Sequence, residues 1–411
     1  MPATDAPLTE APAPTRPRDP EPGSPLALAL YEIYTGKPVV MVDSPPGAGK
    51  STLVARAVSH LFDATDATIV VAVFTNDQGA DLSERIAAEL GPDHEGVPRV
   101  RAGSANIPEA EGVLRPGDFP DRRCVTVRTV ASCKASPPRC DVLVVDEAYQ
   151  TTFADFADAA DFADQVLVVG DPGQIGPVIA FSSDAWDRMK RAPHMRCPEV
   201  LLQREDVTRL TLPATYRLGP QTTRVIAPLY DFAFDSRRPL RRLEGLDGEI
   251  AVVNVPVREK EYDLDTIGTV VAAASSYVGR TVIETGPNGV ETSRALTERD
   301  VAIVVSRNAQ VSAVEALLLA AGFSVGDFTV GSADRLQGGQ WHAVVAVDPA
   351  LAGAGSGHAL SSGRLCVMLS RHMTHLTWVY DDSWSETLAE YEDTTDAAKG
   401  TAVRTLLAEL A

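Results

Sequence analysis

The sequence predicts an α/β protein with two tandem domains, each built around a parallel β-sheet. Short apolar, β-branched runs alternate with helical patterns, as expected for parallel strands joined by crossover helices. This alternation starts near residue 39 and starts again after about residue 205. The chain has 411 residues, 45% of them hydrophobic, which is enough for two cores of ordinary size and leaves little for a third.

Composition divides the chain further. Residues 1–25 are rich in Pro and Ala and poor in large apolar side chains, so we expect a disordered tail there. We expect the first domain over 26–205 and the second over 206–411, with a boundary defined only to within several residues.

Individual elements follow from the same patterns. In the first domain we expect a helix over 26–35 and strands over 39–42, 68–74, 141–145 and 165–169. In the second we expect buried strands at 302–306, 328–332, 342–348, 365–370 and 376–381, with a helix over 310–322.

Charge and cysteine content restrict the class of protein. No apolar run of membrane-spanning length and no secretory signal is seen, so we expect a cytoplasmic protein without a membrane partner. Five scattered cysteines without a CxxC pair predict a reducing compartment and no structural metal. A net charge of −19 means that binding to nucleic acid would need a local basic groove, unless the charge serves solubility alone.

The segment SPPGAGKST follows the strand at 39–42 and opens a helix, which is the context of a phosphate-binding loop. Its glycines let backbone N–H groups surround a phosphate at the positive end of the helix. We expect Lys50 to bridge the β- and γ-phosphates of ATP and Ser51 to ligate Mg²⁺. The remaining expected nucleotide contacts are Pro46, Gly47, Ala48, Gly49 and Thr52. Ser44 replaces the usual first glycine, which requires a negative φ there.

Two further strand ends carry catalytic side chains. Asp146 and Glu147 follow the strand VLVV, at the edge where open α/β sheets bind ligands. We expect Asp146 to hold Mg²⁺ and Glu147 to act as the base that polarises the attacking water. Gln174 follows the strand QVLVV and can reach the γ-phosphate from that position.

The order of these segments resembles that of superfamily 1 helicases. SPPGAGKST, DEAYQ and GDPGQIGPV resemble motifs I, II and III, and VAVFTNDQGADLSERI resembles motif Ia. VGSADRLQGGQWHAVVAV and RLCVMLSRHMTHLTWVYD resemble motifs V and VI. LPATYRLGPQTTRVIAPLYDF and VVSRNAQVSAVEALL are similar to segments of the Upf1-like branch. The resemblance covers about residues 27–382 and implies a minimal form with two RecA-like domains and ATP in the cleft between them.

This resemblance also implies roles for individual residues. Arg217 and Arg371 would reach the γ-phosphate from the second domain, and Gln340 stands where motif V usually has the Glu associated with ribose recognition. Contacts with single-stranded DNA or RNA are implied for Thr75, Asn76, Thr129 and Arg307. His372 stands where Ala usually follows the motif VI arginine.

Two surface features have alternative interpretations. Arg237, Arg238, Arg241 and Arg242 either line a nucleic-acid groove or form a solvated turn. Trp341 either stacks on a base or packs in the core.

We therefore expect an ATP- and Mg²⁺-dependent helicase or translocase, with the 5′ to 3′ polarity that the resemblance implies. The alternative is an ATPase switch that recruits a protein partner without unwinding. A scaffold that does not hydrolyse ATP is disfavoured because the catalytic residue types are all present.

Overall fold

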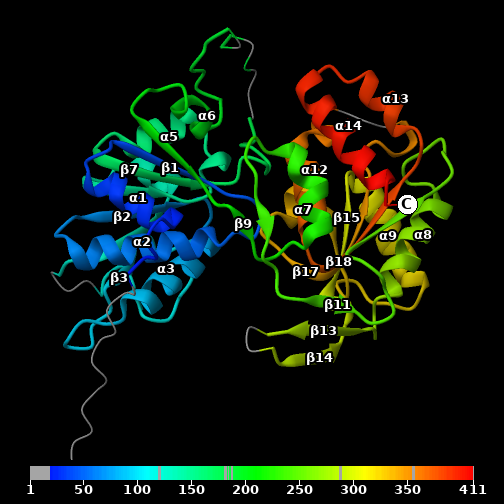
Figure 1. The fold of residues 1–411 in the computed structure, drawn as a ribbon, viewed down its shortest axis with the longest axis horizontal. Helices are drawn as coiled ribbons and strands as arrows, with labels where there is room; N and C mark the ends of the chain where they lie inside the picture. Colours follow the sequence, from blue (N-terminus) through cyan, green and yellow to red (C-terminus); the bar gives the residue numbers. More distant parts are fainter. Residues whose placement is uncertain are drawn as a thin grey trace, which may run out of the picture. The chain divides into compact units, whose positions relative to one another are not determined.

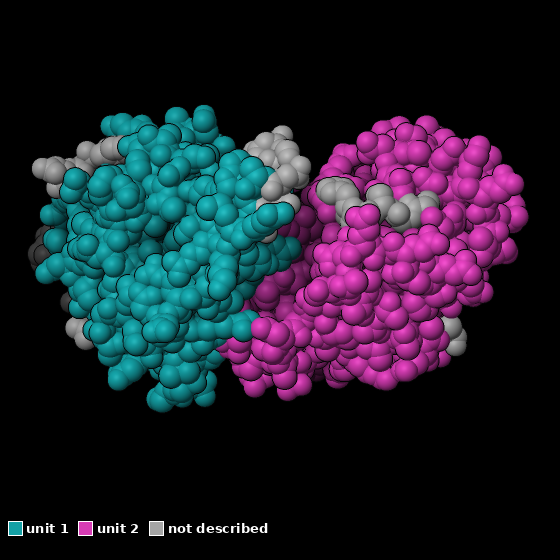
Figure 2. All heavy atoms as spheres, turned by 90° about the horizontal axis from the view of Figure 1, so that it is seen from above, with its two compact units in different colours: residues 1–42, 50–170, 179–210 teal, residues 43–49, 171–178, 211–411 magenta. Residues whose placement is uncertain are grey.

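The computed structural model describes residues 19–118, 122–179, 183, 185–186, 188–286, 289–353 and 357–410 (Figure 1). Contacts group the chain into two compact units, coloured in Figure 2. Unit 1 comprises 1–42, 50–170 and 179–210, and unit 2 comprises 43–49, 171–178 and 211–411. The phosphate-loop segment 43–49 thus belongs to unit 2 by its contacts. Residues 1–18 of the predicted tail lie outside the described residues, and its last residue, Pro25, begins the first helix.

The sheet of unit 1 has eight strands among the described residues, in the order β4-β3-β5-β2-β6-β7-β1-β8. Its central pairs, such as β2 with β5 and β6, are parallel. The strands are β1 (Val39–Asp43), β2 (Ile69–Val73), β3 (Val100–Ala102), β4 (Val113–Leu114), β5 (Val125–Thr129), β6 (Cys140–Val145), β7 (Ala163–Gly170) and β8 (Val207–Thr211). Residues of β1, β2 and β6 are buried throughout or nearly so, because both faces of the sheet are covered.

Helices cover both faces of this sheet (Figure 1). They are α1 (Pro25–Tyr34), α2 (Lys50–Ala64), α3 (Asn76–Leu90), α4 (Val130–Ala135), α5 (Phe153–Ala160) and α6 (Cys197–Leu201), with a 3-10 turn η1 (Ala148–Gln150). On one face α4, α5 and α6 pack on alternate strand residues such as Met41 and Leu143. α2 and α3 pack against each other on the opposite face.

The main sheet of unit 2 has five parallel strands among the described residues, in the order β12-β18-β17-β15-β16. These are β12 (Ile250–Asn254), β15 (Val301–Val305), β16 (Thr329–Ser332), β17 (Trp341–Val347) and β18 (His372–Tyr380). Ala302 and Val304 of β15 face one core cluster, and Val301, Ile303 and Val305 face the other. The two-residue repeat of a strand therefore supplies both cores.

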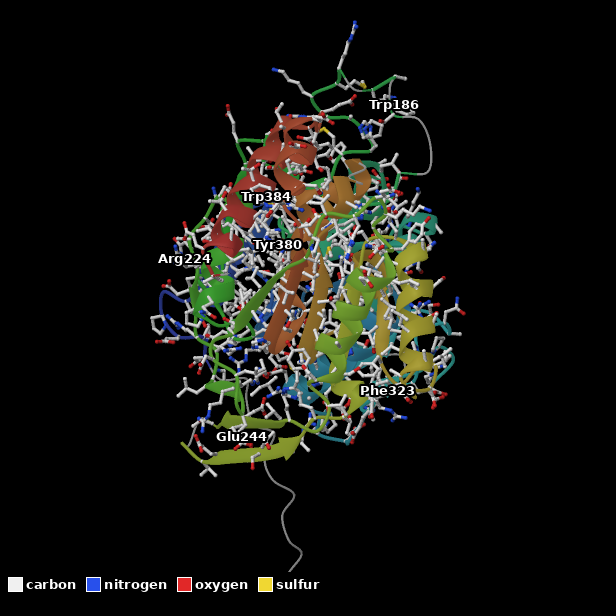
Figure 3. The ribbon with its side chains drawn as sticks, turned by 90° about the vertical axis from the view of Figure 1, so that its right-hand side faces the viewer. Trp186, Arg224, Glu244, Phe323, Tyr380 and Trp384 are labelled. Atoms are coloured by element: carbon white, nitrogen blue, oxygen red, sulfur yellow. The ribbon has the colours of Figure 1, made fainter. Side chains whose placement is uncertain are left out.

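One cluster is covered by α7 (Pro220–Ile226), α12 (Ser362–Ser370) and α14 (Thr394–Ala408), and the other by α8 (Leu264–Ser275) and α9 (Asn308–Ala320). Tyr380 and Trp384, labelled in Figure 3, belong to the α14 side. Phe323, which follows α9 and is also labelled in Figure 3, belongs to the cluster covered by α8 and α9. Its ring makes an edge contact with that of Phe328.

The predicted strand at 365–370 is wrong, because these residues form the last two turns of α12. They are all buried, and a short apolar run that is buried on all sides lacks the polar positions that distinguish a helix from a strand.

Unit 2 also contains several smaller elements. β11 (Arg241–Leu243), β13 (Thr281–Thr285) and β14 (Glu291–Ala295) form an antiparallel sheet, while β9 (Ala214–Thr215) pairs in parallel with β10 (Asp235–Ser236). The remaining elements are η2 (Ala227–Leu229), η3 (Glu298–Asp300), η4 (Leu351–Gly353), α10 (Ala333–Leu336), α11 (Gly357–Leu360) and α13 (Trp384–Ala389). Among the described residues, no helix has the length and apolar character needed to cross a membrane.

Candidate nucleotide site and nucleic-acid interface

The predicted site residues of the first half follow strands of one sheet. Residues 44–49 come after β1, Thr75 after β2, and Asp146 after β6, while Thr129 ends β5. The pairs β2–β5, β2–β6 and β6–β7 are parallel, so the carboxyl ends of β2, β5, β6 and β7 share an edge. This is the edge at which open α/β sheets bind their ligands.

The phosphate loop has the backbone that its glycines permit. Gly47 and Gly49 have φ values of 72° and 88°, which L side chains rarely adopt. Ser44 is buried, and it is not among the non-glycine residues with positive φ in the described chain. α2 begins at Lys50, so the positive end of its dipole adjoins the loop. Serine is therefore compatible with the first position of the loop.

The other predicted nucleotide contacts differ in exposure. Pro46 and Ala48 are buried, Ser51 is half-buried, and Thr52 is exposed. The Ser51 and Thr52 side chains therefore lie nearer the surface than those of Pro46 and Ala48.

Lys50 and Glu147 form an ion pair, with Nζ and Oε1 3.3 Å apart. Glu147 has a left-handed backbone (φ 52°, ψ 40°), which is uncommon for a residue with a side chain and is often found at functional sites. Asp146 beside it is buried, and its Oδ1 accepts a hydrogen bond from the Glu147 N–H (2.9 Å). Burial, followed by the charge of Glu147, raises the pKa of Asp146 to about 7, whereas Lys50 lowers it.

The carboxylate of Asp146 and the hydroxyl of Ser51 fit the donor set of a magnesium site. Magnesium prefers oxygen ligands and retains several waters, so one carboxylate and one hydroxyl suffice on the protein side. A bound cation would also favour the charged form of the buried Asp146.

The segment around β9 lies on the phosphate loop. The Leu212 N–H donates to the Asp43 carbonyl oxygen (2.8 Å), and the Tyr216 N–H donates to that of Gly47 (2.9 Å). The Thr215 hydroxyl donates to the carbonyl oxygen of Pro46 (2.6 Å). A β-carbon added to Gly47 would lie 2.3 Å from Cβ of Arg217. The backbone that carries Arg217 is therefore in contact with the loop.

Gln174 is held by two other polar side chains. Its Nε2 donates to Oδ2 of Asp171 (2.7 Å), and its Oε1 accepts from Nε2 of Gln337 (3.4 Å). The hydroxyl of Tyr230 donates to Oδ1 of the same Asp171 (2.9 Å), and a β-carbon at Gly173 would overlap the Tyr230 ring. These contacts connect the segment that follows β7 to the segment that follows α10.

Arg371 is buried, with 2% of its surface exposed, and lies between α12 and β18. Its Nη2 donates to Oγ of Ser370 (3.0 Å), and its Nη1 donates to the Gly339 carbonyl oxygen (3.5 Å). The Trp341 N–H donates to the carbonyl oxygen of Arg371 (3.0 Å). The segments that precede β17 and β18 are thus joined where these two strands begin.

Thr75 and Thr129 cap helices. The Thr75 hydroxyl accepts from the Gln78 N–H, and the Gln78 side chain accepts from the Thr75 N–H, which completes a capping box for α3. The Thr129 hydroxyl accepts from the Ser132 N–H at the start of α4. The T-x-x-Q spacing of the first pair is visible in the sequence and could have predicted this cap. Asn76, the first residue of α3, is half-buried.

Arg307 lines a pocket of about 450 Å³ at the carboxyl ends of β15 and β16. The pocket is also lined by Ser306, Asn308, Ser332 and Arg364. Arg307 pairs with Glu261 (Nε to Oε1, 3.3 Å), and Arg364 pairs with Asp334 (2.7 Å). Arg371, in contrast, precedes β18 and thus lies at the amino edge of the same sheet.

The basic cluster does not form a uniform cationic surface. Arg238 has a largely buried side chain and pairs with Glu249, while Arg241 pairs with Glu284 and Arg242 with Glu291. Arg237 is exposed.

Trp341 is partly buried against the α12 side of the core, which agrees with core packing. The neighbouring Gln340 is exposed.

Residues 27–209 match the model of a family described as AAA domain. Among solved structures, the chain is similar to that of PRRSV helicase (16% identity, TM-score 0.45, covering 86% of this chain and 54% of that one). It is also similar to arterivirus nonstructural protein 10, a helicase (15% identity, TM-score 0.48, covering 88% of this chain and 64% of that one). The structure of that helicase in complex with DNA gives 15% identity and a TM-score of 0.48, covering 88% of this chain and 65% of that one. The chain thus spans between 54% and 65% of the length of these proteins. A comparison with curated proteins gave no match.

Proposed function

We propose that the protein hydrolyses ATP and couples hydrolysis to movement along single-stranded DNA or RNA. The main support is the contact between the phosphate loop and the segment 212–217, because it sets the backbone of Arg217 beside Gly47. Guanidinium groups stabilise the charge on a transferring phosphoryl group and thereby raise the hydrolysis rate by about 10³- to 10⁵-fold.

The nucleotide would bind to the loop as follows. Backbone N–H groups of 47–49 and the start of α2 would hold the phosphates, with Lys50 between the β- and γ-phosphates. Ser51 and Asp146 would hold Mg²⁺, which when bound neutralises charge on the phosphate oxygens. Pro46, Ala48 and Thr52 would line the nucleotide, and Gln340 would take the ribose.

Glu147 would accept the proton of the attacking water. Its carboxylate is paired with Lys50 at 3.3 Å, so binding of a triphosphate to Lys50 would release the carboxylate for this role. Gln174, Arg217 and Arg371 would complete the site around the γ-phosphate. The left-handed backbone of Glu147 supports a functional role, because such strain is maintained only where the surrounding structure requires it.

Single-stranded nucleic acid would contact the carboxyl edges of the two sheets. Thr75, Asn76 and Thr129 would serve the first sheet, where Phe74 is also exposed. Arg307 and its pocket would serve the second. A further surface pocket of about 820 Å³ is lined by Met189, Lys190, Arg191 and Gln203, and it offers two cations to a phosphate backbone. The Met189 N–H donates to the carbonyl oxygen of Trp186, which Figure 3 labels.

The finer classification rests on the sequence resemblance. It implies superfamily 1, the Upf1-like branch and 5′ to 3′ movement, in a minimal form with ATP hydrolysed between two RecA-like domains. A separate partner protein would then assist in strand separation.

An ATPase switch that recruits a protein partner is the second candidate. The net charge of −19 favours it, as do the many arginines that are paired with carboxylates, such as Arg99 with Asp63 and Arg404 with Asp348.

Steady-state ATP turnover with and without poly-dT or poly-U separates the two candidates. We expect stimulation of many-fold by at least one polymer, and no turnover in Glu147→Gln although this variant still binds nucleotide. Turnover that is equal with and without both polymers would support the switch. Turnover in Glu147→Gln at the wild-type rate would remove Glu147 from the mechanism.

A further inference from the structure

A buried carboxylate in unit 2 contacts the two segments that carry the candidate arginines. Glu249, with 4% of its surface exposed, lies just before β12. Its Oε1 accepts from the Gly219 N–H (2.6 Å), and its Oε2 accepts from the Thr222 N–H (3.2 Å). Gly219 is the N-cap of α7 and follows Arg217 by two residues.

The same carboxylate reaches the segment of Arg371. Oε1 of Glu249 lies 3.1 Å from Nε2 of His372, which is fully buried and directly follows Arg371. Nε2 of His372 is also 2.9 Å from the Thr222 hydroxyl. Arg238 completes the cluster, with Nη1 at 3.4 Å from Oε1 of Glu249 and at 2.8 Å from the Met373 carbonyl oxygen, to which it donates.

A side chain at position 219 would disturb this arrangement. A β-carbon there would lie 2.4 Å from Oε2 of Glu249 and 2.7 Å from Nη2 of Arg238. The close approach lets one carboxylate accept from the start of α7 and from the start of β18 together. It also explains why histidine at 372, where the resembling motif has alanine, is accommodated, since its ring nitrogen has two partners.

We infer that Glu249 is a positioning residue, which holds the Arg217 and Arg371 segments in one fixed arrangement through Gly219, Thr222 and His372. The inference rests on the proposed function, in which both arginines stabilise the transferring phosphoryl group. Buried charge-assisted hydrogen bonds are short and directional, so their loss would let the two segments shift. A misplacement of about 1 Å in such a site costs roughly 10²-fold in rate.

The first test compares Glu249→Gln with Asp348→Asn. Asp348 and Arg404 form another buried ion pair of unit 2 (Oδ1 to Nη2, 2.6 Å). Because this pair is remote in sequence from Arg217 and Arg371, Asp348→Asn controls for the loss of stability alone. We expect both variants to lower Tm. Glu249→Gln should also lower kcat by roughly 10²-fold, with a change in KM of less than about threefold.

A double-mutant cycle supplies a readout that stability does not affect. If Glu249 acts through the arginines, Glu249→Gln should lower kcat less in the Arg217→Ala or Arg371→Ala background than it does in wild type, because only one guanidinium is left to misplace. Should Glu249→Gln fail to fold, Gly219→Ala enters the same cycle, because its methyl group displaces the carboxylate and keeps every charge.

The inference is overturned if Glu249→Gln lowers kcat no more than Asp348→Asn does, or if its effect multiplies fully with that of each arginine variant. Both results leave the proposed function intact as long as the arginine variants lose activity. If Arg217→Ala and Arg371→Ala keep the wild-type kcat, the proposed roles of the arginines fail and the positioning role fails with them.

Discussion

At the scale of single residues, the candidate site depends on a few close contacts that tolerate no extra atoms. Gly47 combines a φ of 72° with a neighbouring Cβ of Arg217 that an added methyl group would meet at 2.3 Å. Gly36 has a similar φ of 81°, yet nothing lies within 4 Å of the position of its missing β-carbon. Comparing substitutions at Gly47 and Gly36 therefore distinguishes the effect of backbone strain from that of steric overlap.

Gly47→Ala should lower nucleotide affinity and turnover by at least about tenfold, because backbone strain of roughly 1 kcal/mol is joined by a clash with the Arg217 segment. Gly36→Ala should cost only the strain, seen as a small decrease in Tm with normal turnover. Nucleotide affinity by fluorescence titration and Tm by calorimetry provide the measurements. Equal effects of the two substitutions on affinity would show that the contact with Arg217 is unimportant.

Glu249 also gives stability a dependence on pH. Burial by itself would raise its pKa, but the hydrogen bond and charge of His372, followed by Arg238 and the Gly219 N–H, lower the pKa to about 2. The pKa of Glu249 is thus lower in the folded protein than in the unfolded chain. Ionised Glu249 therefore adds its full contribution to the free energy of unfolding above pH about 5, and this contribution is lost as pH falls toward 2.

Glu249→Gln should therefore lower the free energy of unfolding at pH 7 by about 3 kcal/mol, and the difference from wild type should shrink below pH about 4. Urea denaturation at several pH values measures it. A difference that stays constant down to pH about 3 would contradict the lowered pKa.

At the scale of elements, parallel strands explain why distant motifs gather. In unit 2 the pairing of β15 with β16 and β17 sets Arg307 and Ser332 at the carboxyl edge. Arg371 precedes β18 and lies at the opposite edge. The sheet thus separates the candidate nucleic-acid contact from the candidate phosphate contact.

Arg307→Ala should weaken binding of single-stranded nucleic acid and reduce the slope of log affinity against log salt by about one, since it removes one phosphate contact. Arg56, an exposed arginine of α2 that is paired with Glu89, is the control. Fluorescence anisotropy with a labelled oligonucleotide at several salt concentrations measures both variants. An unchanged slope in Arg307→Ala would exclude this contact.

Sequence patterns predicted the elements whose periodicity or glycines are distinctive. The phosphate loop, the strands before Asp146 and Gln174, and the parallel α/β class could be predicted because apolar runs and turn residues mark them. The helix at 365–370 could not, since all its residues are buried. Glu249 carries no sequence signal, because its partners Gly219 and His372 are brought to it only by folding.

For the molecule as a whole, the charge balance restricts how a polyanion could bind. The chain carries 56 acidic and 37 basic residues, and repulsion from this excess must be overcome locally. Stimulation of turnover by a nucleic acid would then decrease as salt increases, with a slope set by the number of phosphate contacts that the local cations make.

The proposed mechanism depends most on a guanidinium that the C-terminal half would supply to the triphosphate held by Lys50. Single-turnover hydrolysis of ATP by wild type and Arg217→Ala, at nucleotide concentrations that saturate both, tests it most directly. We expect Arg217→Ala to bind ATP with similar affinity and to hydrolyse it about 10³-fold or more slowly. Hydrolysis by Arg217→Ala at the wild-type rate would contradict the proposed role of Arg217.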